Sequence, residues 1–204
     1  MSPSDRHRVK TERLDPAIVV AAYRSGFFPM AESRTGPIAW YSPDPRAVIP
    51  LDAFNIPRTV RRARARSECT VTINTAFPQV IAACAGRPEG TWISSEIVDV
   101  YTVLHRQGIA HSVETWLSGR LAGGLYGVSI GGAFFGESMF SRESNMSKFA
   151  LMHLVERLVS RGFLLLDTQI VNDHMRQFGA VEIPRQDYLA QLGKAISARV
   201  TFLE

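Results

Sequence analysis

Cysteine is scarce in this sequence: the 204 residues include only Cys69 and Cys84, which form no Cys-x-x-Cys pair. This scarcity excludes a small disulfide-stapled scaffold and a zinc site built on cysteine pairs, so we expect both cysteines to serve in packing. The five histidines show no metal-ligand spacing, and we expect them at the surface or in packing. No run of about 18 apolar residues occurs, so no membrane-spanning helix is predicted. We therefore expect a cytoplasmic protein without a metal.

Lysine is scarce too, because 20 of the 23 basic residues are arginine. Residues 1–66 contain 12 basic and 6 acidic residues, whereas residues 67–204 contain 11 and 13, so the positive charge is concentrated in the first third. Five arginines fall within nine positions: Arg58, Arg61, Arg62, Arg64 and Arg66. Planar guanidinium groups suit phosphate oxygens, which predicts a polyanionic partner. The alternative is the solvated basic face of an exposed helix.

The sequence predicts a small N-terminal α+β domain over residues 1–57 and a larger domain over 58–204. With 46% hydrophobic and 21% charged residues, the chain can bury a substantial core. Asp15 and Pro16 form an N-cap and first-turn pair that begins a helix over 17–24. Residues 38–41 and 47–51 are predicted strands on either side of the Ser42–Pro45 turn, and the arginines lie on a helix over 57–66.

The larger domain is predicted to contain a mixed sheet. Hydrophobic periodicity favours strands over 69–74, 110–117, 121–130, 133–140, 163–166 and 199–203, and helices over 76–85, 95–107, 145–161, 172–178 and 187–196. Ser118-Gly119 and Gly131-Gly132 are predicted hairpin turns. The order β-α-α-β-β-β-α-β-α-β resembles that of the acetyltransferase-like (GNAT-like) fold, so we expect an α/β protein that transfers an acyl group.

The turn between the strand over 133–140 and the long helix bears on the acyl donor. In a GNAT-like protein a glycine-rich segment at this place holds the pyrophosphate of coenzyme A. Here Ser141 to Lys148 contains no glycine. This absence argues against coenzyme A and favours a different activated acyl donor.

Polar residues interrupt two apolar strands, which marks a candidate site. Glu137 is set between Phe134-Phe135-Gly136 and Ser138-Met139-Phe140, and Asp167 ends the run Leu164-Leu165-Leu166. Gln169 follows two positions later, so in an extended strand Asp167 and Gln169 would point to the same face. A substrate site is one interpretation. The other is a buried carboxylate satisfied by an arginine or by a helix N-terminus.

Several ordered motifs extend from about Leu14 to the C-terminus. They are Gly26-Phe27-Phe28-Pro29, Trp40-Tyr41-Ser42-Pro43-Asp44-Pro45-Arg46-Ala47-Val48, Thr91-Trp92-Ile93, His111-Ser112-Val113-Glu114-Thr115-Trp116, Gly123-Gly124-Leu125-Tyr126-Gly127-Val128, Gly136-Glu137-Ser138-Met139-Phe140-Ser141, Asn145 to Lys148, Asp167-Thr168-Gln169, Asn172-Asp173-His174 and Gly179-Ala180. With these motifs the sequence resembles the bacterial leucyl/phenylalanyl-tRNA–protein transferases.

This resemblance implies an aminoacyltransferase that moves Leu, Phe or Met from aminoacyl-tRNA to an N-terminal Arg or Lys of an acceptor protein and thereby generates a degradation signal. It implies no metal and no coenzyme. By similarity, Asp167 and Gln169 would bind and help deprotonate the acceptor amine, and Glu137 would hydrogen-bond within that group. Positioning is expected to supply most of the rate, because an aminoacyl ester is already activated.

The resemblance also implies positions for the donor. The aminoacyl side chain would occupy a pocket formed by Leu125, Phe134, Leu151, Leu158 and Leu166, although ordinary core packing is an alternative for each. Trp40 and Trp92 would stack on or shape the site for the 3′-terminal adenosine. Asn172 is grouped with these donor-binding residues, and the arginine cluster would contact the phosphates of the tRNA acceptor stem.

Two other functions stay open on sequence alone. One is an acyl transferase that uses another donor or acceptor, such as a peptidoglycan amine. The other is an RNA-binding module without catalytic activity.

Overall fold

The N-terminal part of the chain forms a three-stranded antiparallel sheet. The computed structural model describes residues 6–7, 14–87 and 90–203. The strand order of the small sheet is β1 (Arg6–His7), β3 (Ile38–Tyr41) and β2 (Phe28–Ala31). Helix α1 (Pro16–Arg24) lies between β1 and β2 in the chain and begins where the Asp15 carboxylate accepts hydrogen bonds from the backbone N–H groups of Ala17 and Ile18. The predicted N-cap and Pro16 are confirmed.

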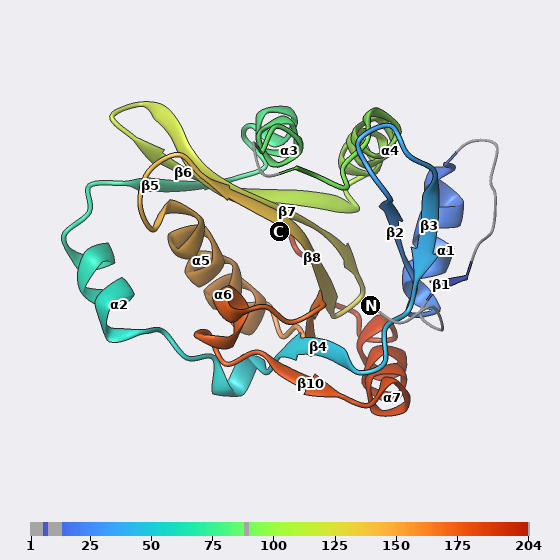
Figure 1. Cartoon of the computed structure of the whole chain (residues 1–204). Coiled ribbons are helices and arrows are strands. Elements are labelled where there is room, and N and C mark those ends of the chain that lie inside the picture. Colours follow the sequence, from blue (N-terminus) through green and yellow to red (C-terminus); the bar gives the residue numbers. More distant parts are fainter. Residues whose placement is uncertain (1–5, 8–13, 88–89, 204) are drawn as a thin grey trace.

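A seven-stranded mixed sheet forms the centre of the molecule (Figure 1). Its order is β10 (Val181–Ile183), β4 (Arg46–Ile49), β9 (Leu165–Gln169), β8 (Ala133–Ser141), β7 (Arg120–Ile130), β6 (Ala110–Leu117) and β5 (Thr70–Ile73). Neighbouring strands are antiparallel except β8 and β9, which are parallel. The predicted α/β class is confirmed, and so is the acetyltransferase-like order of elements from β5 to β9; the last strand of the series is β10 and not the predicted 199–203.

Helices cover both faces of this sheet. Helices α3 (Phe77–Ala85) and α4 (Ser95–Arg106) lie on one face and α5 (Met146–Ser160) on the other (Figure 1). Helix α7 (Arg185–Ile196) packs against α1, β8 and β9, and α2 (Arg58–Ala65) packs against α5. Short helical turns occur at η2 (Leu51–Ala53) and α6 (Asp173–Arg176). This layering places the apolar faces of the helices against the sheet.

The predicted hairpins are present. β6 pairs with β7 across Ser118-Gly119, where both residues have positive φ angles, 50° and 73°. β7 pairs with β8 across Gly131-Gly132. Both turns therefore follow from local sequence.

The strands predicted on either side of the Ser42–Pro45 turn are present as β3 and β4, but they belong to different sheets: β3 pairs with β1 and β2, whereas β4 pairs with β9 and β10. One strand assignment from the sequence is wrong. Residues 199–203 form no strand; the ring of Phe202 instead packs against those of Phe134 and Phe163. Phe202 is buried by this packing rather than by strand pairing, whereas Leu203 is exposed.

Strands β2 and β10 were not predicted, and β9 extends beyond the predicted end at 166 to Gln169. Both cysteines are free and buried, which confirms their role in packing. Among the described residues no helix is long and apolar enough to cross a membrane, and no group of three or more His, Cys, Asp or Glu side chains is placed to hold a metal ion.

Candidate active site

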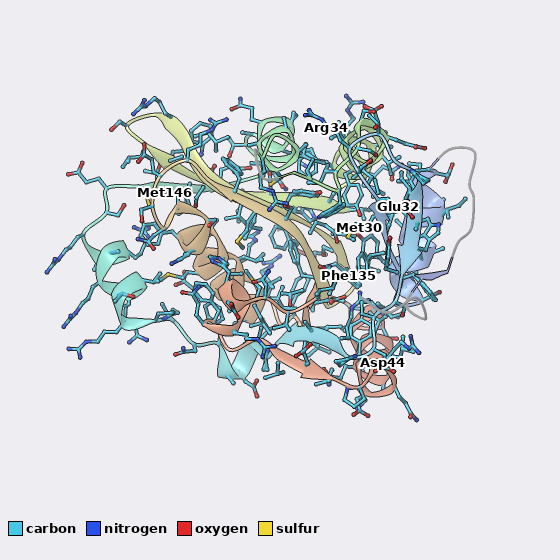
Figure 2. All side chains as sticks on the ribbon, in the orientation of Figure 1. Met30, Glu32, Arg34, Asp44, Phe135 and Met146 are labelled. Atoms are coloured by element: carbon cyan, nitrogen blue, oxygen red, sulfur yellow. The ribbon has the colours of Figure 1, made fainter. Side chains whose placement is uncertain are left out.

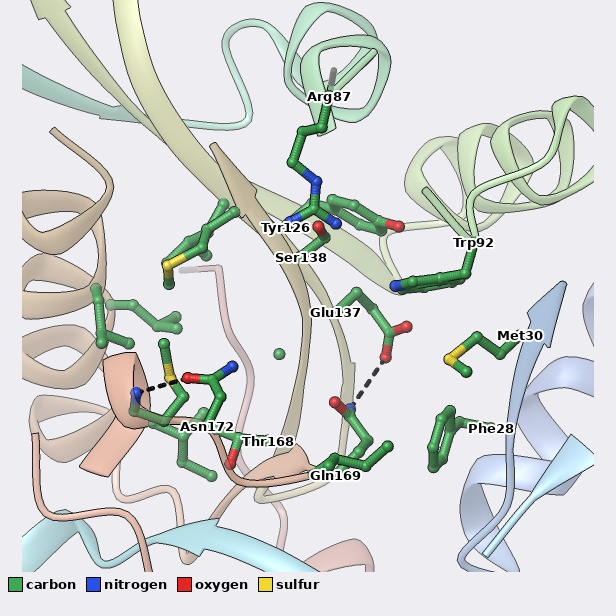
Figure 3. A pocket seen from close by; sticks show the side chains of 18 residues that line it. Phe28, Met30, Arg87, Trp92, Tyr126, Glu137, Ser138, Thr168, Gln169 and Asn172 are labelled. Carbon is green, nitrogen blue, oxygen red and sulfur yellow. Dashed lines mark hydrogen bonds between the residues drawn. The ribbon is translucent and has the colours of Figure 1, made fainter. Parts of the chain in front are cut away.

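A cavity opens where the two parallel strands separate. The pairing of β8 with β9 ends at Phe135 and Asp167, and β8 continues to Ser141 without this neighbour. The cavity has a volume of about 250 Å³ and lies between the diverging strands, α5 and strand β2 of the small sheet (Figure 3). Diverging strand ends commonly form ligand crevices in α/β proteins.

A β-bulge directs Glu137 into this cavity. Tyr126 pairs with Ser138 and Gly127 pairs with Gly136, so Glu137 is the extra residue on β8. Gly127 is required opposite the bulge, since a Cβ atom there would lie 2.3 Å from the Phe135 carbonyl oxygen. Bulges re-aim side chains in this way, and Glu137 lines the cavity.

Glu137 connects the cavity to a buried group of tyrosines. Its Oε1 accepts a hydrogen bond from Gln169 Nε2 at 3.3 Å, and its Oε2 accepts one from the Tyr101 hydroxyl at 3.3 Å. The Tyr101 hydroxyl is in turn hydrogen-bonded to the Tyr23 hydroxyl. Burial raises the pKa of Glu137 to about 8, although the tyrosine hydroxyls and Arg46 act in the opposite direction. The carboxyl can therefore exchange a proton near neutral pH.

A second bulge separates Asp167 from Gln169. Ala47 pairs with Gln169 and Val48 with Asp167, so Thr168 is the extra residue on β9. Gln169 has a φ of 59°, a left-handed conformation that is uncommon for a residue with a side chain. Its backbone N–H donates to Asp167 Oδ1 at 2.8 Å, so the carboxylate holds Gln169 in this conformation.

Asp167 lies behind the cavity wall, with its side chain 0% exposed. Arg46 Nε and Nη2 donate to Oδ1 and Oδ2 at 3.0 and 2.7 Å, and the Tyr188 hydroxyl donates to Oδ2 at 2.7 Å. The guanidinium of Arg46 also lies over the rings of Phe28 and Tyr188 and donates to the Gly26 carbonyl.

Asp167 and Gln169 form one hydrogen-bonded group, but their side chains do not share a face as an uninterrupted strand would require. Asp167 turns to Arg46, whereas Gln169 lines the cavity beside Glu137 (Figure 3). The contacts of Asp167 match the alternative interpretation, a buried carboxylate paired with an arginine. Arg46 was missed because no single-strand pattern relates positions 46 and 167.

The apolar positions predicted for the donor side chain divide into two groups. Leu125, Leu151 and Leu166 line the cavity, whereas Phe134 of β8 and Leu158 of α5 are 0% exposed and lie in the core between helix and sheet. The wall is completed by residues that the sequence analysis missed, namely Met139, Leu154, Ile170 and Met175. Leu154 follows Leu151 by one helical turn on α5, and this spacing would have identified it.

The two tryptophans predicted for the adenosine site lie in different environments. Trp92 lines the cavity with Phe28 and Met30 of β2 (Figure 3), and its carbonyl accepts a hydrogen bond from the Ala31 backbone N–H. Trp40 is 6% exposed, in the core of the small sheet, and its strand neighbour in β2 is Pro29. Trp92 is therefore in a position to contact a ligand directly, and Trp40 supports β2.

Asn172 lines the cavity from the loop before α6, where its Oδ1 accepts from the Met175 backbone N–H at 2.9 Å. Three further residues were missed at the opposite end of the cavity: Arg87, Tyr126 and Ser138. Tyr126 and Ser138 belong to motifs noted in the sequence, but nothing in the strand pattern indicates that they face the cavity with Arg87.

The arginine cluster lies on and directly after α2, away from this cavity and beyond α5 (Figure 1). Arg58, Arg61, Arg62 and Arg66 are exposed, and the guanidinium of Arg64 lies 5.7 Å from the centre of the Phe149 ring of α5. Several side chains of α2 extend away from the body of the molecule (Figure 2), while Val60 is buried against α5. No described acidic side chain forms a salt bridge with these five arginines.

Two family models match the chain. The leucyl/phenylalanyl-tRNA protein transferase N-terminal domain matches residues 12–44, and the leucyl/phenylalanyl-tRNA protein transferase model matches residues 48–193. The leucyl/phenylalanyl-tRNA–protein transferase of Chlorobaculum tepidum is 50% identical over 91% of this chain and 97% of its own length. That of Gloeobacter violaceus is 52% identical over 93% and 97%. A solved ribosomal-protein-alanine N-acetyltransferase from Brucella melitensis covers 53% of this chain and 86% of its own at 15% identity, with a TM-score of 0.37.

Proposed function

The chain belongs to the leucyl/phenylalanyl-tRNA protein transferase family and is an aminoacyltransferase of that kind; we propose that it moves Leu, Phe or Met from aminoacyl-tRNA to the N-terminal Arg or Lys of acceptor proteins, which marks them for degradation. Because aminoacyl-tRNA is made in the cytoplasm, we place the reaction there. The observation that carries the proposal is the Glu137–Gln169 pair facing an apolar wall across one cavity.

The cavity provides separate places for the two reacting groups. Leu125, Leu151 and Leu166 offer an apolar surface to the donor side chain. An apolar pocket discriminates one methylene by only about 1–3 kcal/mol, so overlapping use of Leu, Phe and Met is expected. The Glu137–Gln169 pair offers oxygen acceptors for an α-amine, and a cationic N-terminal side chain beside Glu137 would favour the ionised form of its carboxyl.

The chemistry requires little base strength. The acceptor α-amine attacks the ester carbonyl of the donor, loses one proton, and displaces the 3′ oxygen of the adenosine, which gains one. The Gln169 amide nitrogen donates to Glu137 at 3.3 Å, which leaves its carbonyl oxygen for the attacking amine. Since the amine has an ordinary pKa of about 8 and the pKa of Glu137 is raised to about 8, proton exchange between them is nearly balanced.

Asp167 acts in this scheme as a positioning residue. Its carboxylate is enclosed by Arg46, Tyr188 and the Gln169 backbone, so it acts on the acceptor through Gln169. A catalytic amide held in one conformation avoids the entropic cost of ordering it in each turnover.

The donor tRNA would bind through two surfaces. Trp92 would stack on the terminal adenosine, which is a sequence-tolerant contact, with Trp40 shaping that end of the site by supporting β2. The exposed arginines on and directly after α2 would contact acceptor-stem phosphates. Phe134 and Leu158 would support the pocket from the core.

The test is transfer of radiolabelled leucine from Leu-tRNA to two acceptor proteins that are identical except for an N-terminal Arg or Ala. Label restricted to the Arg acceptor is the expected result. Transfer to other amines alone would favour an acyl transferase with a different acceptor. If Leu-tRNA, Phe-tRNA and Met-tRNA bind without transfer to any amine, the proposed reaction is wrong and an RNA-binding role is favoured.

A further inference from the structure

Three polar side chains meet at the end of the cavity away from α6. Tyr126 and Ser138 face each other across β7 and β8, and Arg87 follows the C-terminal end of α3. Figure 3 shows the Arg87 guanidinium beside Ser138 and Tyr126. All three residues line the cavity.

These side chains have unused hydrogen-bonding capacity. Arg87 Nε and the Tyr126 hydroxyl are buried and have no hydrogen-bond partner among the residues that the structure describes, and the Ser138 hydroxyl has only the weakly bonding thiol of Cys84 beside it. Tyr126 is 0% exposed, and its ring is held edge-on against Phe77 and Tyr101. A buried donor without a partner costs about 1–3 kcal/mol, so unpaired donors gathered at one place in a cavity indicate a ligand.

The ligand that fits is an anion. Arg87 is cationic, and burial raises the pKa of Tyr126 well above its usual value, so the hydroxyl remains a donor. Together with the Ser138 hydroxyl these groups can donate three hydrogen bonds to oxygen atoms that carry negative charge. Glu137 is close enough to contribute to the raised pKa of Tyr126, but burial raises its own pKa to about 8, so at neutral pH its carboxyl is mostly uncharged and repels an anion little.

A second, larger cavity continues from this point. It has a volume of about 910 Å³ and shares Arg87, Met139, Asn172 and Met175 with the first cavity. Arg142 also lines it, and none of its described lining residues is acidic. Among the described residues of this wall, a polyanionic strand that leaves the first cavity at Arg87 would therefore meet no carboxylate.

We propose that Arg87, Tyr126 and Ser138 bind the phosphodiester that precedes the terminal adenosine of the donor, and that the preceding nucleotide enters the second cavity beside Arg142. This inference rests on the proposed function, since it assumes a tRNA donor. An acceptor protein is disfavoured as the occupant, because its basic N-terminal residue would be repelled by Arg87.

The test compares three donors that differ only beyond the terminal adenosine: the phenylalanyl ester of adenosine, that of cytidylyl-adenosine, and that of cytidylyl-adenosine with a neutral methylphosphonate linkage. The acceptor is a peptide with N-terminal Arg. We expect wild-type kcat/KM to be highest for the phosphodiester donor. The donor ratio is kcat/KM for the phosphodiester donor divided by kcat/KM for the adenosine ester. It should fall about 10- to 100-fold in Arg87→Gln and several-fold in Tyr126→Phe.

The matched control is Arg106→Gln, since Arg106 is exposed and lines none of the described cavities; its donor ratio should equal that of wild type. Tyr126→Phe keeps the ring and removes only the unpaired hydroxyl, so its folding is preserved. An unchanged donor ratio in folded Arg87→Gln and Tyr126→Phe overturns the proposal. The proposal is also overturned if the variants lose the same factor of kcat/KM with all three donors and show a higher KM for the acceptor peptide. That result would mean that the cluster binds the acceptor.

A binding measurement separates this proposal from the proposed function. Cytidylyl-adenosine and its methylphosphonate analogue carry no amino acid, and their affinities can be followed by Trp fluorescence. If no variant and no donor supports transfer, the proposed function fails, but tighter binding of the phosphodiester that is lost in Arg87→Gln would still support the anion site. Equal affinity of both dinucleotides for wild type would overturn it.

Discussion

Asp167→Asn tests whether the buried carboxylate stabilises and positions the site. In the wild type the carboxylate accepts two hydrogen bonds from Arg46, one from Tyr188 and one from the Gln169 backbone, at 2.7 to 3.0 Å. Asparagine retains one oxygen and replaces the other by an NH2 group, which must face an N–H or O–H donor. The Arg46 charge is then left buried without a counter-charge.

The expected loss in the free energy of unfolding is about 3–5 kcal/mol, the range for breaking a buried ion pair on one side. Urea denaturation followed by circular dichroism would measure it. Two variants calibrate the result. Glu182→Gln breaks the exposed Arg176–Glu182 pair and should cost less than about 1 kcal/mol. Tyr188→Phe removes one donor to the charged carboxylate but keeps the Arg46–Asp167 pair, and should cost about 1.5–3 kcal/mol.

Transfer kinetics are measured on the same preparation under conditions where Asp167→Asn is folded. Because the carboxylate holds Gln169, kcat should fall while the KM for the donor stays near the wild-type value. A destabilisation below about 1 kcal/mol would refute the argument about the buried charge. Wild-type kcat in the folded variant would refute the positioning role.

The remaining predictions concern Glu137, the leucine wall and the arginines. A pKa near 8 for Glu137 in the folded protein, above its unfolded value, means that unfolding releases a proton between about pH 5 and pH 8. The free energy of unfolding of the wild type should therefore fall relative to that of Glu137→Gln as the pH rises across this window, by at most about 1.4 kcal/mol per pH unit in denaturation experiments. If the two proteins show the same pH dependence of stability, the raised pKa of Glu137 is contradicted. Leu151→Ala should alter the relative kcat/KM for Leu and Phe donors. Leu158→Ala in the core should cost about 2–5 kcal/mol of stability and leave the relative kcat/KM of the two donors unchanged. Similar donor ratios in the two variants would argue against the distinction between leucines that line the cavity and leucines in the core. Replacing Arg62, Arg64 and Arg66 by alanine should weaken tRNA binding and reduce its salt dependence by about one counterion per lost contact, measured by filter binding at several salt concentrations. An unchanged slope would show that α2 is not part of the tRNA interface.

Local patterns in the sequence were sufficient for the elements that depend on near neighbours. Asp15 and Pro16 predicted the start of α1, and Ser118-Gly119 predicted the β6–β7 turn, because capping and tight turns are set by adjacent residues. The ordered motifs predicted the family. Glu137 and Gln169 were chosen because polar residues in apolar strands are costly unless they have a use, and both line the cavity.

Those local patterns could not predict which distant segments pair with each other. β4 follows a predicted turn after β3, yet it pairs with β9, about 120 positions later. The apolar pattern of residues 199–203 is that of a strand, but packing of Phe202 against Phe134 satisfies it. A periodic pattern shows that one face is buried and leaves open which partner buries it.

The sequence by itself determined the family, the order of most elements and two of the polar groups in the cavity, since each depends on residues that are close in the chain. Only the tertiary structure decided which way those groups face. The bulges at Glu137 and Thr168 arise from the register between two strands, so Asp167 turns to Arg46 across 121 positions while Gln169 turns to the cavity. The meeting of Arg87, Tyr126 and Ser138 is likewise a property of packing, because a helix end and two strands must be brought together before their donors share one place.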